Sequence, residues 1–143
     1  MTIAKIIADR DETDIIACDA ATPVSEAVRM LAGKRIGAVP VMDAGQIVGI
    51  TSERDVIYCL ADKGHDALEL TVGDIMTSPA ITVTPQTPID EALALMTRRR
   101  FRHFPVVDNG QLVAFISIGD LVKDKIDEVE HEAAALRDYI QTV

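Results

Sequence analysis

The pattern serine-x-x-aspartate occurs twice in the chain, as Ser52-Glu53-Arg54-Asp55 and as Ser117-Ile118-Gly119-Asp120. In both places it joins an apolar stretch to a predicted helix, so the serine can cap the helix while the acid bonds back to the serine backbone. Such a capping box explains either copy without a ligand. A carboxylate there can also accept hydrogen bonds from the two hydroxyls of a ribose, and the helix N-terminus attracts anions. Because both copies share one register, we expect Ser52, Asp55, Ser117 and Asp120 to line ligand sites.

Basic residues gather at one place in the sequence, namely Arg98, Arg99, Arg100, Arg102 and His103. We expect Arg98 and Arg99 to lie on a solvated helix C-terminus, where cations complement the helix dipole. Arg102 and His103 come at the predicted start of a strand, which directs them toward a cleft. Cations near a ribose-binding carboxylate indicate phosphate, so Arg102, His103 and Arg54 are candidate phosphate ligands.

The composition limits the classes of function. The 143 residues include 14 Lys and Arg against 23 Asp and Glu, so the net charge is −9, and only 3% are aromatic. A phosphate backbone needs a basic face and single-stranded bases need aromatic platforms, so nucleic-acid binding is a weak alternative. No apolar run is long enough for a membrane span, and we expect no signal peptide.

Cys18 and Cys59 are the only cysteines, and each lies in an apolar stretch. Two cysteines do not make a disulfide framework, so we expect buried free thiols in a reducing cytoplasm. The three histidines have no ligand spacing to one another or to the cysteines. The sequence therefore predicts no metal site.

The chain repeats itself at an offset of 65 residues. Residues 16–56 align with 81–121 without a gap and are identical at 14 of 41 positions. Upstream, Thr2–Ile7 resembles Thr71–Met76 at an offset of 69. A repeat of this clarity sets the fold, because each copy must form the same unit.

Each copy is predicted to form a β-α-β-β-α unit. The first strands are Ile15–Cys18 and Ala80–Val83, and each leads to a Thr-Pro pair, with threonine expected as N-cap and proline as first helical residue. The hairpin strands are Ala38–Met42 with Gln46–Thr51, and His103–Val107 with Gln111–Ser117. Gly45 and Gly110 suit the positive φ of tight turns, and Pro40 and Pro105 are expected at a strand start or sheet edge. The second helices begin at Ser52 and Ser117.

Neither copy is large enough to bury a sufficient core alone. We therefore predict an α+β fold in which the two repeats pack sheet to sheet about a pseudo-twofold axis, with related clefts at their junction. Residues 1–60 form the first repeat, 61–70 the linker and 71–123 the second repeat.

Residues 124–143 are predicted to extend the last helix. An apolar stripe runs through it with spacings of 4, 3, 4, 3 and 4, at Val122, Ile126, Val129, Ala133, Leu136 and Ile140. The stripe fits a helix lying on its own domain, and it also fits a dimer contact or short coiled coil.

The ordered motifs resemble the cystathionine-β-synthase (CBS) domain. The second copy carries the resemblance through Asp74-Ile75-Met76-Thr77, Thr82-Val83, Thr87-Pro88, Glu91-Ala92, Arg102–Asp108 and Ser117–Leu121. The first carries it through Thr22-Pro23, Glu26-Ala27, Gly37–Val41 and Gly49–Asp55. It covers essentially the whole chain, as a tandem pair (Bateman module) of the stand-alone bacterial kind.

This resemblance implies a regulatory module that binds adenosine-containing ligands, with AMP foremost and ADP, ATP, NAD(H) or S-adenosylmethionine as further candidates, and signals energy or redox state to a separate partner. It implies that Asp55 and Asp120 take ribose hydroxyls, with Ser52 and Ser117 assisting, and that Arg54, Arg102 and His103 meet phosphate. It also implies an adenine pocket, formed by Ile36, Ala38, Val39, Met76, Thr77, Thr82, Val83 and Phe101. Such modules usually pair as disc-like homodimers, which fits the C-terminal stripe.

Two other functions compete with this interpretation. An enzyme is disfavoured, because the sequence has no nucleophile elbow, phosphate-cradling glycine loop or metal constellation. A structural or dimerisation module with empty clefts remains open, with both serine-x-x-aspartate patterns as plain caps. The copies also differ, since Arg102 and His103 correspond to Gly37 and Ala38, and Arg54 corresponds to Gly119. We therefore expect unequal clefts, of which one is empty or holds a different ligand, with Arg54 able to serve either.

Overall fold

Each copy of the repeat forms an antiparallel hairpin flanked in sequence by helices. The first copy consists of β1 (Cys18–Asp19), α2 (Val24–Lys34), β2 (Ala38–Asp43), β3 (Gln46–Ser52) and α3 (Glu53–Lys63). The second consists of α5 (Ile89–Arg99), β4 (His103–Asp108), β5 (Gln111–Ser117) and α6 (Ile118–Gln141). The computed structural model describes residues 1–142 and confirms an α+β fold with two repeats and a long C-terminal helix.

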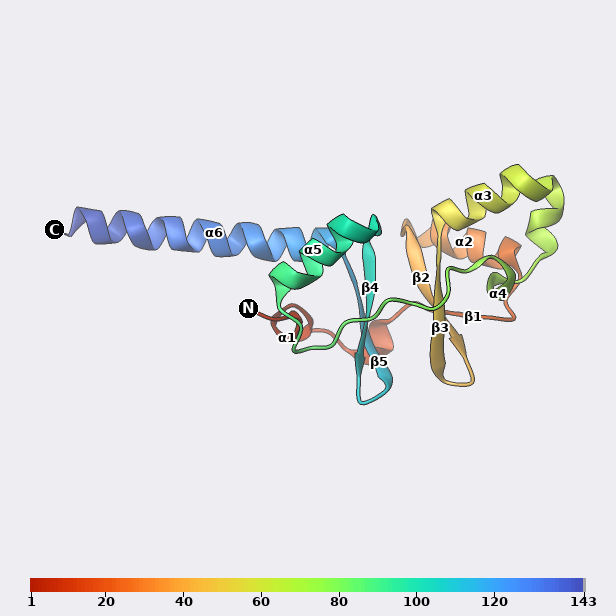
Figure 1. The fold of residues 1–143 in the computed structure, drawn as a ribbon, viewed down its shortest axis with the longest axis horizontal. Coiled ribbons are helices and arrows are strands. Elements are labelled where there is room, and N and C mark those ends of the chain that lie inside the picture. The colour runs from red at the N-terminus through yellow and green to blue at the C-terminus, as the bar shows by residue number, and fades with distance from the viewer. Residues whose placement is uncertain (143) are drawn as a thin grey trace.

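The two hairpins stand side by side at the centre of the molecule, and β3 contacts β5 (Figure 1). Helices α2 and α3 lie at the end of the first repeat, and α5 lies at the opposite end with the start of α6 (Figure 1). Short helices complete the fold, namely α1 (Ile3–Ile7), α4 (Val72–Ile75) and two 3-10 turns over Glu12–Asp14 and Gly64–Glu69.

The two repeats exchange their first helices. Ile3 of α1 is fully buried in the core of the second repeat, and its N–H donates to the Thr87 carbonyl at 2.9 Å. Its counterpart Val72 of α4 is fully buried in the core of the first repeat, and its N–H donates to the Thr22 carbonyl at 2.7 Å. Each packed unit therefore takes a helix from the other half of the sequence, and separating the halves would expose both side chains.

The first strand of each copy is shorter than predicted. In place of Ile15–Cys18, β1 pairs with β2 only through Cys18 and Asp19. In place of Ala80–Val83, a single bridge joins Val83 to Val106. Pro40 and Pro105 are the third residues of β2 and β4 rather than strand starts, and they are tolerated because these strands have so little pairing on their second side.

The predicted helix starts are wrong by one residue, while the turns are confirmed. Pro23 and Pro88, with extended backbone, are themselves the N-caps of α2 and α5, and the threonines before them make no cap. Both hairpins turn through two residues of positive φ, Ala44-Gly45 and Asn109-Gly110. Two such residues make the turn whose twist matches antiparallel strands, which fixes the register of each hairpin.

The segment predicted as a linker is mostly helical. Helix α3 runs to Lys63, and the 3-10 turn over Gly64–Glu69 buries Ala67 completely. This packing holds α4 against the first repeat, where Met76 and Ile75 cover its core.

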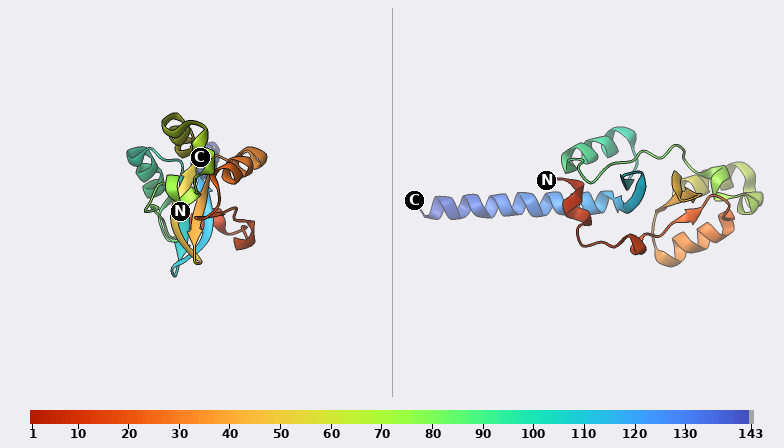
Figure 2. Two further views of the ribbon diagram at one scale, coloured as in Figure 1. Left: turned by 90° about the vertical axis from the view of Figure 1, so that its right-hand side faces the viewer. Right: turned by 90° about the horizontal axis from the view of Figure 1, so that it is seen from below.

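Helix α6 packs on its own repeat only at its start. Leu121 is fully buried, but every residue from Val129 to Thr142 is exposed. The helix projects from the body as a single rod (Figure 1 and the right view of Figure 2). The stripe predicted from the sequence is therefore present and uncovered within this chain.

Candidate functional site

Two clefts lie where the repeats meet, and each contains one serine-x-x-aspartate pattern. The Asp55 cleft, of about 810 Å³, is lined by Ser52–Asp55, by Thr77 and Ile81, and by Arg99–His103. The Asp120 cleft, of about 400 Å³, is lined by Ser117 and Asp120, by Arg10 and Ile16, and by Ile36. Ile16 and Ile36 are the counterparts of Ile81 and Phe101 at the repeat offset of 65. The clefts are thus equivalent by position and unequal in size.

In the Asp55 cleft, a capping box leaves one carboxylate oxygen available. The Ser52 N–H donates to Asp55 Oδ2 at 2.9 Å, and the Asp55 N–H donates to Ser52 Oγ at 3.3 Å. The other oxygen, Oδ1, accepts the Thr77 hydroxyl at 3.0 Å. Thr77 is held there by its backbone, which exchanges both hydrogen bonds with Ile50 of β3. Since an ionised carboxylate has about four acceptor positions, Oδ1 retains capacity for a further donor.

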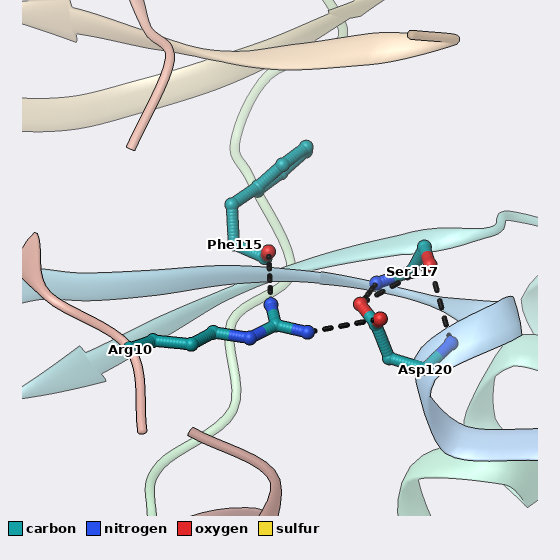
Figure 3. A network of polar contacts seen from close by, with 4 residues as sticks. All are labelled: Arg10, Phe115, Ser117 and Asp120. Carbon is teal, nitrogen blue, oxygen red and sulfur yellow. Dashed lines mark hydrogen bonds and ion pairs between the residues drawn. The ribbon is translucent and has the colours of Figure 1, made fainter. Parts of the chain in front are cut away.

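In the Asp120 cleft, the matching oxygen is engaged by a cation (Figure 3). Arg10 Nη2 lies 2.9 Å from Asp120 Oδ1, and Arg10 Nη1 donates to the Phe115 carbonyl at 3.2 Å. Ser117 and Asp120 form the same capping box as in the other cleft. Although burial acts to raise the pKa of Asp120, the Ser117 hydrogen bonds and the Arg10 guanidinium together hold it below its ordinary value. The carboxylate is therefore ionised and already paired.

The clefts also differ in charge. Arg54, Arg99, Arg100 and Arg102 line the Asp55 cleft against two carboxylates, those of Glu53 and Asp55. In the Asp120 cleft, Arg10 stands alone against Asp11, Asp14 and Asp120. The first cleft is net positive in a protein of charge −9, and the second is net negative. An anionic ligand is attracted only to the Asp55 cleft.

His103 lies between the clefts and lines both. Its ring stacks on Phe115, with centroids 5.3 Å apart and planes 10° apart. Burial lowers the pKa of His103, Arg102 lowers it further, and Asp120 and Glu53 act in the opposite sense. The imidazole is therefore neutral at pH 7 and can donate or accept a hydrogen bond without adding charge.

The structure brings together most of the predicted ribose and phosphate ligands and about half of the predicted adenine pocket. Ser52, Asp55, Arg54 and Arg102 share one cleft, and Ser117 and Asp120 share the other. Of the predicted adenine-pocket residues, Ile36, Ala38, Thr77 and Phe101 line a cleft. Val39 and Val83 are buried in the two cores, Met76 packs against the first core, and Thr82 is exposed outside both clefts. Arg54 reaches the Asp55 cleft alone.

Several lining residues were not predicted. Ile16, Ile81 and Ala80 could have been found, because they lie in the first strands predicted for the two copies. Arg10 and Asp14 lie between residues 2–7 and 16–56, in a stretch that has no aligned counterpart in the second copy. Nothing in the sequence signals that Arg10 pairs with Asp120.

Within residues 1–142, no group of three or more His, Cys, Asp or Glu side chains is placed to hold a metal ion. Across the same stretch, no helix combines the length and hydropathy that a membrane crossing requires.

The CBS domain family matches this chain twice, at residues 7–62 and 72–126. A mitochondrial CBS domain-containing protein of Arabidopsis thaliana, CBSX3, is 36% identical over 129 residues. The match covers 87% of this chain and 63% of that protein, so the chain spans less than two thirds of that relative's length.

Solved structures share the fold over nearly the whole chain. A CBS-domain containing protein from Agrobacterium tumefaciens is 33% identical with a TM-score of 0.81, covering 87% of this chain and 99% of that one. CBSX2, solved in complex with AMP, is 25% identical with a TM-score of 0.76, covering 88% of this chain and 96% of that one.

Proposed function

The chain belongs to the CBS-domain family, a family of non-catalytic domains, and on that premise we propose that it is a regulatory module that binds an adenosine-containing ligand between its repeats. AMP is the foremost candidate, and ATP or NAD(H) are further ones. A single observation carries the proposal: the two serine-x-x-aspartate patterns lie in equivalent clefts, each with a carboxylate oxygen beyond the one used by its capping box. CBSX2, which shares the fold, was solved with AMP.

The Asp55 cleft is the proposed nucleotide site. Asp55 Oδ1 would accept the ribose hydroxyls beside Thr77, whose own hydroxyl already donates to that oxygen at 3.0 Å. Ile81 and Phe101 supply apolar surface for the adenine. Arg102, Arg54 and the neutral His103 would meet the phosphate, because guanidinium groups bind phosphate oxygens in pairs.

The Asp120 cleft is proposed to disfavour nucleotides. A ribose there must share Asp120 Oδ1 with Arg10, and a phosphate would face Asp11 and Asp14. A phosphate-free adenosyl compound meets no such repulsion. We therefore expect one nucleotide per chain, in the Asp55 cleft.

We further propose that two copies pair through their repeat faces and C-terminal helices, and that ligand binding is read by a separate downstream protein. Ile57 of α3 and its counterpart Val122 of α6 are 61% and 40% exposed, which leaves apolar surface for such contacts. Cys18 and Cys59 are free thiols, which supports the reducing cytoplasm as the compartment.

The second candidate function is a dimerisation module with empty clefts. It is favoured by Thr71 and Asp74 at the start of α4, where the Thr71 N–H donates to the Asp74 carboxylate at 3.0 Å and neither residue lines a cleft. This chain therefore also uses an aspartate three residues after an N-cap for capping alone.

Calorimetric titration of the full chain with AMP, ATP, NADH, S-adenosylmethionine and adenosine separates the two candidates. A ligand at one hundred times its Kd stabilises the fold by about 2.7 kcal/mol, so a thermal melt gives an independent readout. Arg102→Ala should weaken AMP binding and leave adenosine binding unchanged. No heat and no melting shift with any of the five compounds would leave the dimerisation module as the function.

A further inference from the structure

The outer part of α6 has no contact that could stabilise it. Every residue from Val129 to Thr142 is exposed, and at 1.5 Å per residue this stretch extends about 20 Å into solvent. Isolated helices of this length are marginal in water. Leu136 and Ile140 are 60% and 64% exposed on it. A helix with these properties indicates a partner.

The apolar residues of α6 have the spacing of a two-stranded coiled coil. Spacings of 4, 3, 4, 3 and 4 place Ile126, Ala133 and Ile140 at heptad positions a, and Val122, Val129 and Leu136 at positions d. Isoleucine occupies two of the three a positions and leucine one of the three d positions, and this combination favours two strands in a parallel coiled coil. The face that α6 turns toward its own body is a different one, because Asp124 and Lys125 pair there with Lys5 and Asp90. The stripe can therefore meet a partner while α6 stays docked.

The charged residues beside the stripe favour a second copy of α6 as the partner, and they favour a parallel over an antiparallel pair. In a parallel, in-register pair of this helix, each g residue meets the partner's e residue five positions later. Glu132 then faces Arg137, and this contact joins opposite charges. Lys125, at the other g position, stays paired with Asp90 of its own chain. In an antiparallel pair with the stripes fully overlapped, Glu130 meets Glu130, Glu132 meets Glu132 and Lys123 meets Arg137. Every one of those contacts joins like charges.

On the basis of the pairing of two copies proposed above, we propose that their α6 helices form a parallel, in-register coiled coil from Val122 to Ile140. Two symmetric Glu132–Arg137 ion pairs between the copies would fix this register. Neither residue has an ion-pair partner within the described part of its own chain. The arrangement puts both repeat pairs at the same end of the coiled coil. It does not depend on nucleotide binding.

Cysteine cross-linking tests the direction and register. In a Cys59→Ser background, Ala133→Cys places two thiols across the proposed axis, and mild oxidation should yield a covalent dimer. His131→Cys, at the outward heptad position f, is the matched control and should stay uncross-linked. In the antiparallel pair with overlapped stripes, residue 133 faces residue 129 of the other copy and the two thiols lie apart. An Ala133→Cys protein that stays uncross-linked therefore overturns the proposal. Equal cross-linking of both variants, which indicates random collision, overturns it as well.

Reversing the charges of Glu132 and Arg137 tests the ion pairs between the copies. In the Ala133→Cys background, Glu132→Lys should slow cross-linking roughly tenfold, because it sets lysine against Arg137 at two symmetric contacts. Adding Arg137→Glu should restore the original rate. Asp138→Lys makes the same charge change on the outer face and should have no effect. If the double variant cross-links as slowly as Glu132→Lys alone, the two residues do not meet and the proposed register is wrong.

Discussion

The Arg10 guanidinium lies 2.9 Å from the Asp120 carboxylate, at the position where the matching carboxylate of Asp55 accepts the hydroxyl of Thr77 at 3.0 Å. Two clefts built on one repeated pattern therefore present different chemistry. One offers a carboxylate oxygen beside a neutral hydroxyl, and the other offers a carboxylate oxygen that is already paired with a cation.

Replacing Arg10 by alanine should weaken the fold in a pH-dependent way. The pKa of Asp120 is lowered in the folded protein, so its carboxylate stabilises the fold above the pKa of about 4 that aspartate has in the unfolded chain. This stabilisation is lost as the pH falls through the lower pKa of the folded state. Because Arg10 and Asp120 are 36% and 30% exposed, we expect a loss of about 0.5 kcal/mol at pH 7. Urea unfolding of both proteins measures it. The difference should vanish in acid, and a difference that persists after Asp120 is protonated would show that the pair is not its cause.

His103 should give the fold a second pH dependence, at higher pH. Its pKa is lowered in the folded state by burial, so the unfolded chain takes up the proton first. The stability that the neutral imidazole contributes is fully present above the pKa of about 6.5 that histidine has in the unfolded chain. It is lost as the pH falls from there toward the lower pKa of His103 in the folded protein. Melting temperatures at about pH 7.5 and about pH 5.5 should differ less in His103→Gln than in wild type. The exposed His131→Gln is the control, and the prediction fails if it flattens the profile equally.

Gly49 allows β3 to approach the segment that carries Thr77. A Cβ on Gly49 would lie 2.7 Å from the Thr77 carbonyl and 2.7 Å from Met76 Sδ. Gly49→Ala should therefore destabilise the fold by about 1–3 kcal/mol and also weaken AMP binding, because Thr77 must move. Gly33→Ala, in α2 with nothing within 4 Å, should instead stabilise by about 0.5–1 kcal/mol. Denaturant unfolding that ranks the two variants the other way contradicts this account.

Arg35 and Arg100 end α2 and α5 in the left-handed conformation, with φ of 53° and 58°. Glycine adopts this conformation without penalty, so Arg35→Gly and Arg100→Gly should each stabilise by about 0.5–1 kcal/mol. Arg100 also lines the Asp55 cleft, and Arg35 lines neither. Thermal melts should show the shared gain. Calorimetry should show weaker AMP binding for Arg100→Gly alone, and equal weakening in both variants would show that the place of Arg100 in the Asp55 cleft does not contribute to AMP binding.

The fold was predictable wherever local chemistry determines it. Turn glycines fixed both hairpins, and the serine-x-x-aspartate patterns located the starts of α3 and α6 to the residue. The exchange of α1 and α4 was not predictable, because Ile3 and Val72 are equally apolar whichever repeat they cover. Thr22 and Thr87 were wrongly predicted as N-caps. The proline after each has extended backbone and is itself the N-cap, so each helix begins one residue later than predicted.

The site was predictable where both copies shared a register. Asp55 and Asp120 came from the repeat, and Arg102 stood out against the acidic composition. Val39 and Val83 were assigned to the adenine pocket by resemblance, but both side chains point into the cores. Arg10 could not be found, because its contact with Asp120 joins residues 110 positions apart with no repeated counterpart.

The most direct test of the account is calorimetry of AMP binding to wild type and to three aspartate variants. Asp55→Ala, Asp74→Ala and Asp120→Ala each remove the acid of a capping box, at a cost of about 1 kcal/mol in stability. Wild type should bind one AMP per chain, Asp74→Ala and Asp120→Ala should retain that binding, and Asp55→Ala should lose it at least tenfold. AMP binding that survives unchanged in a folded Asp55→Ala protein would contradict the assignment of the Asp55 cleft as the nucleotide site.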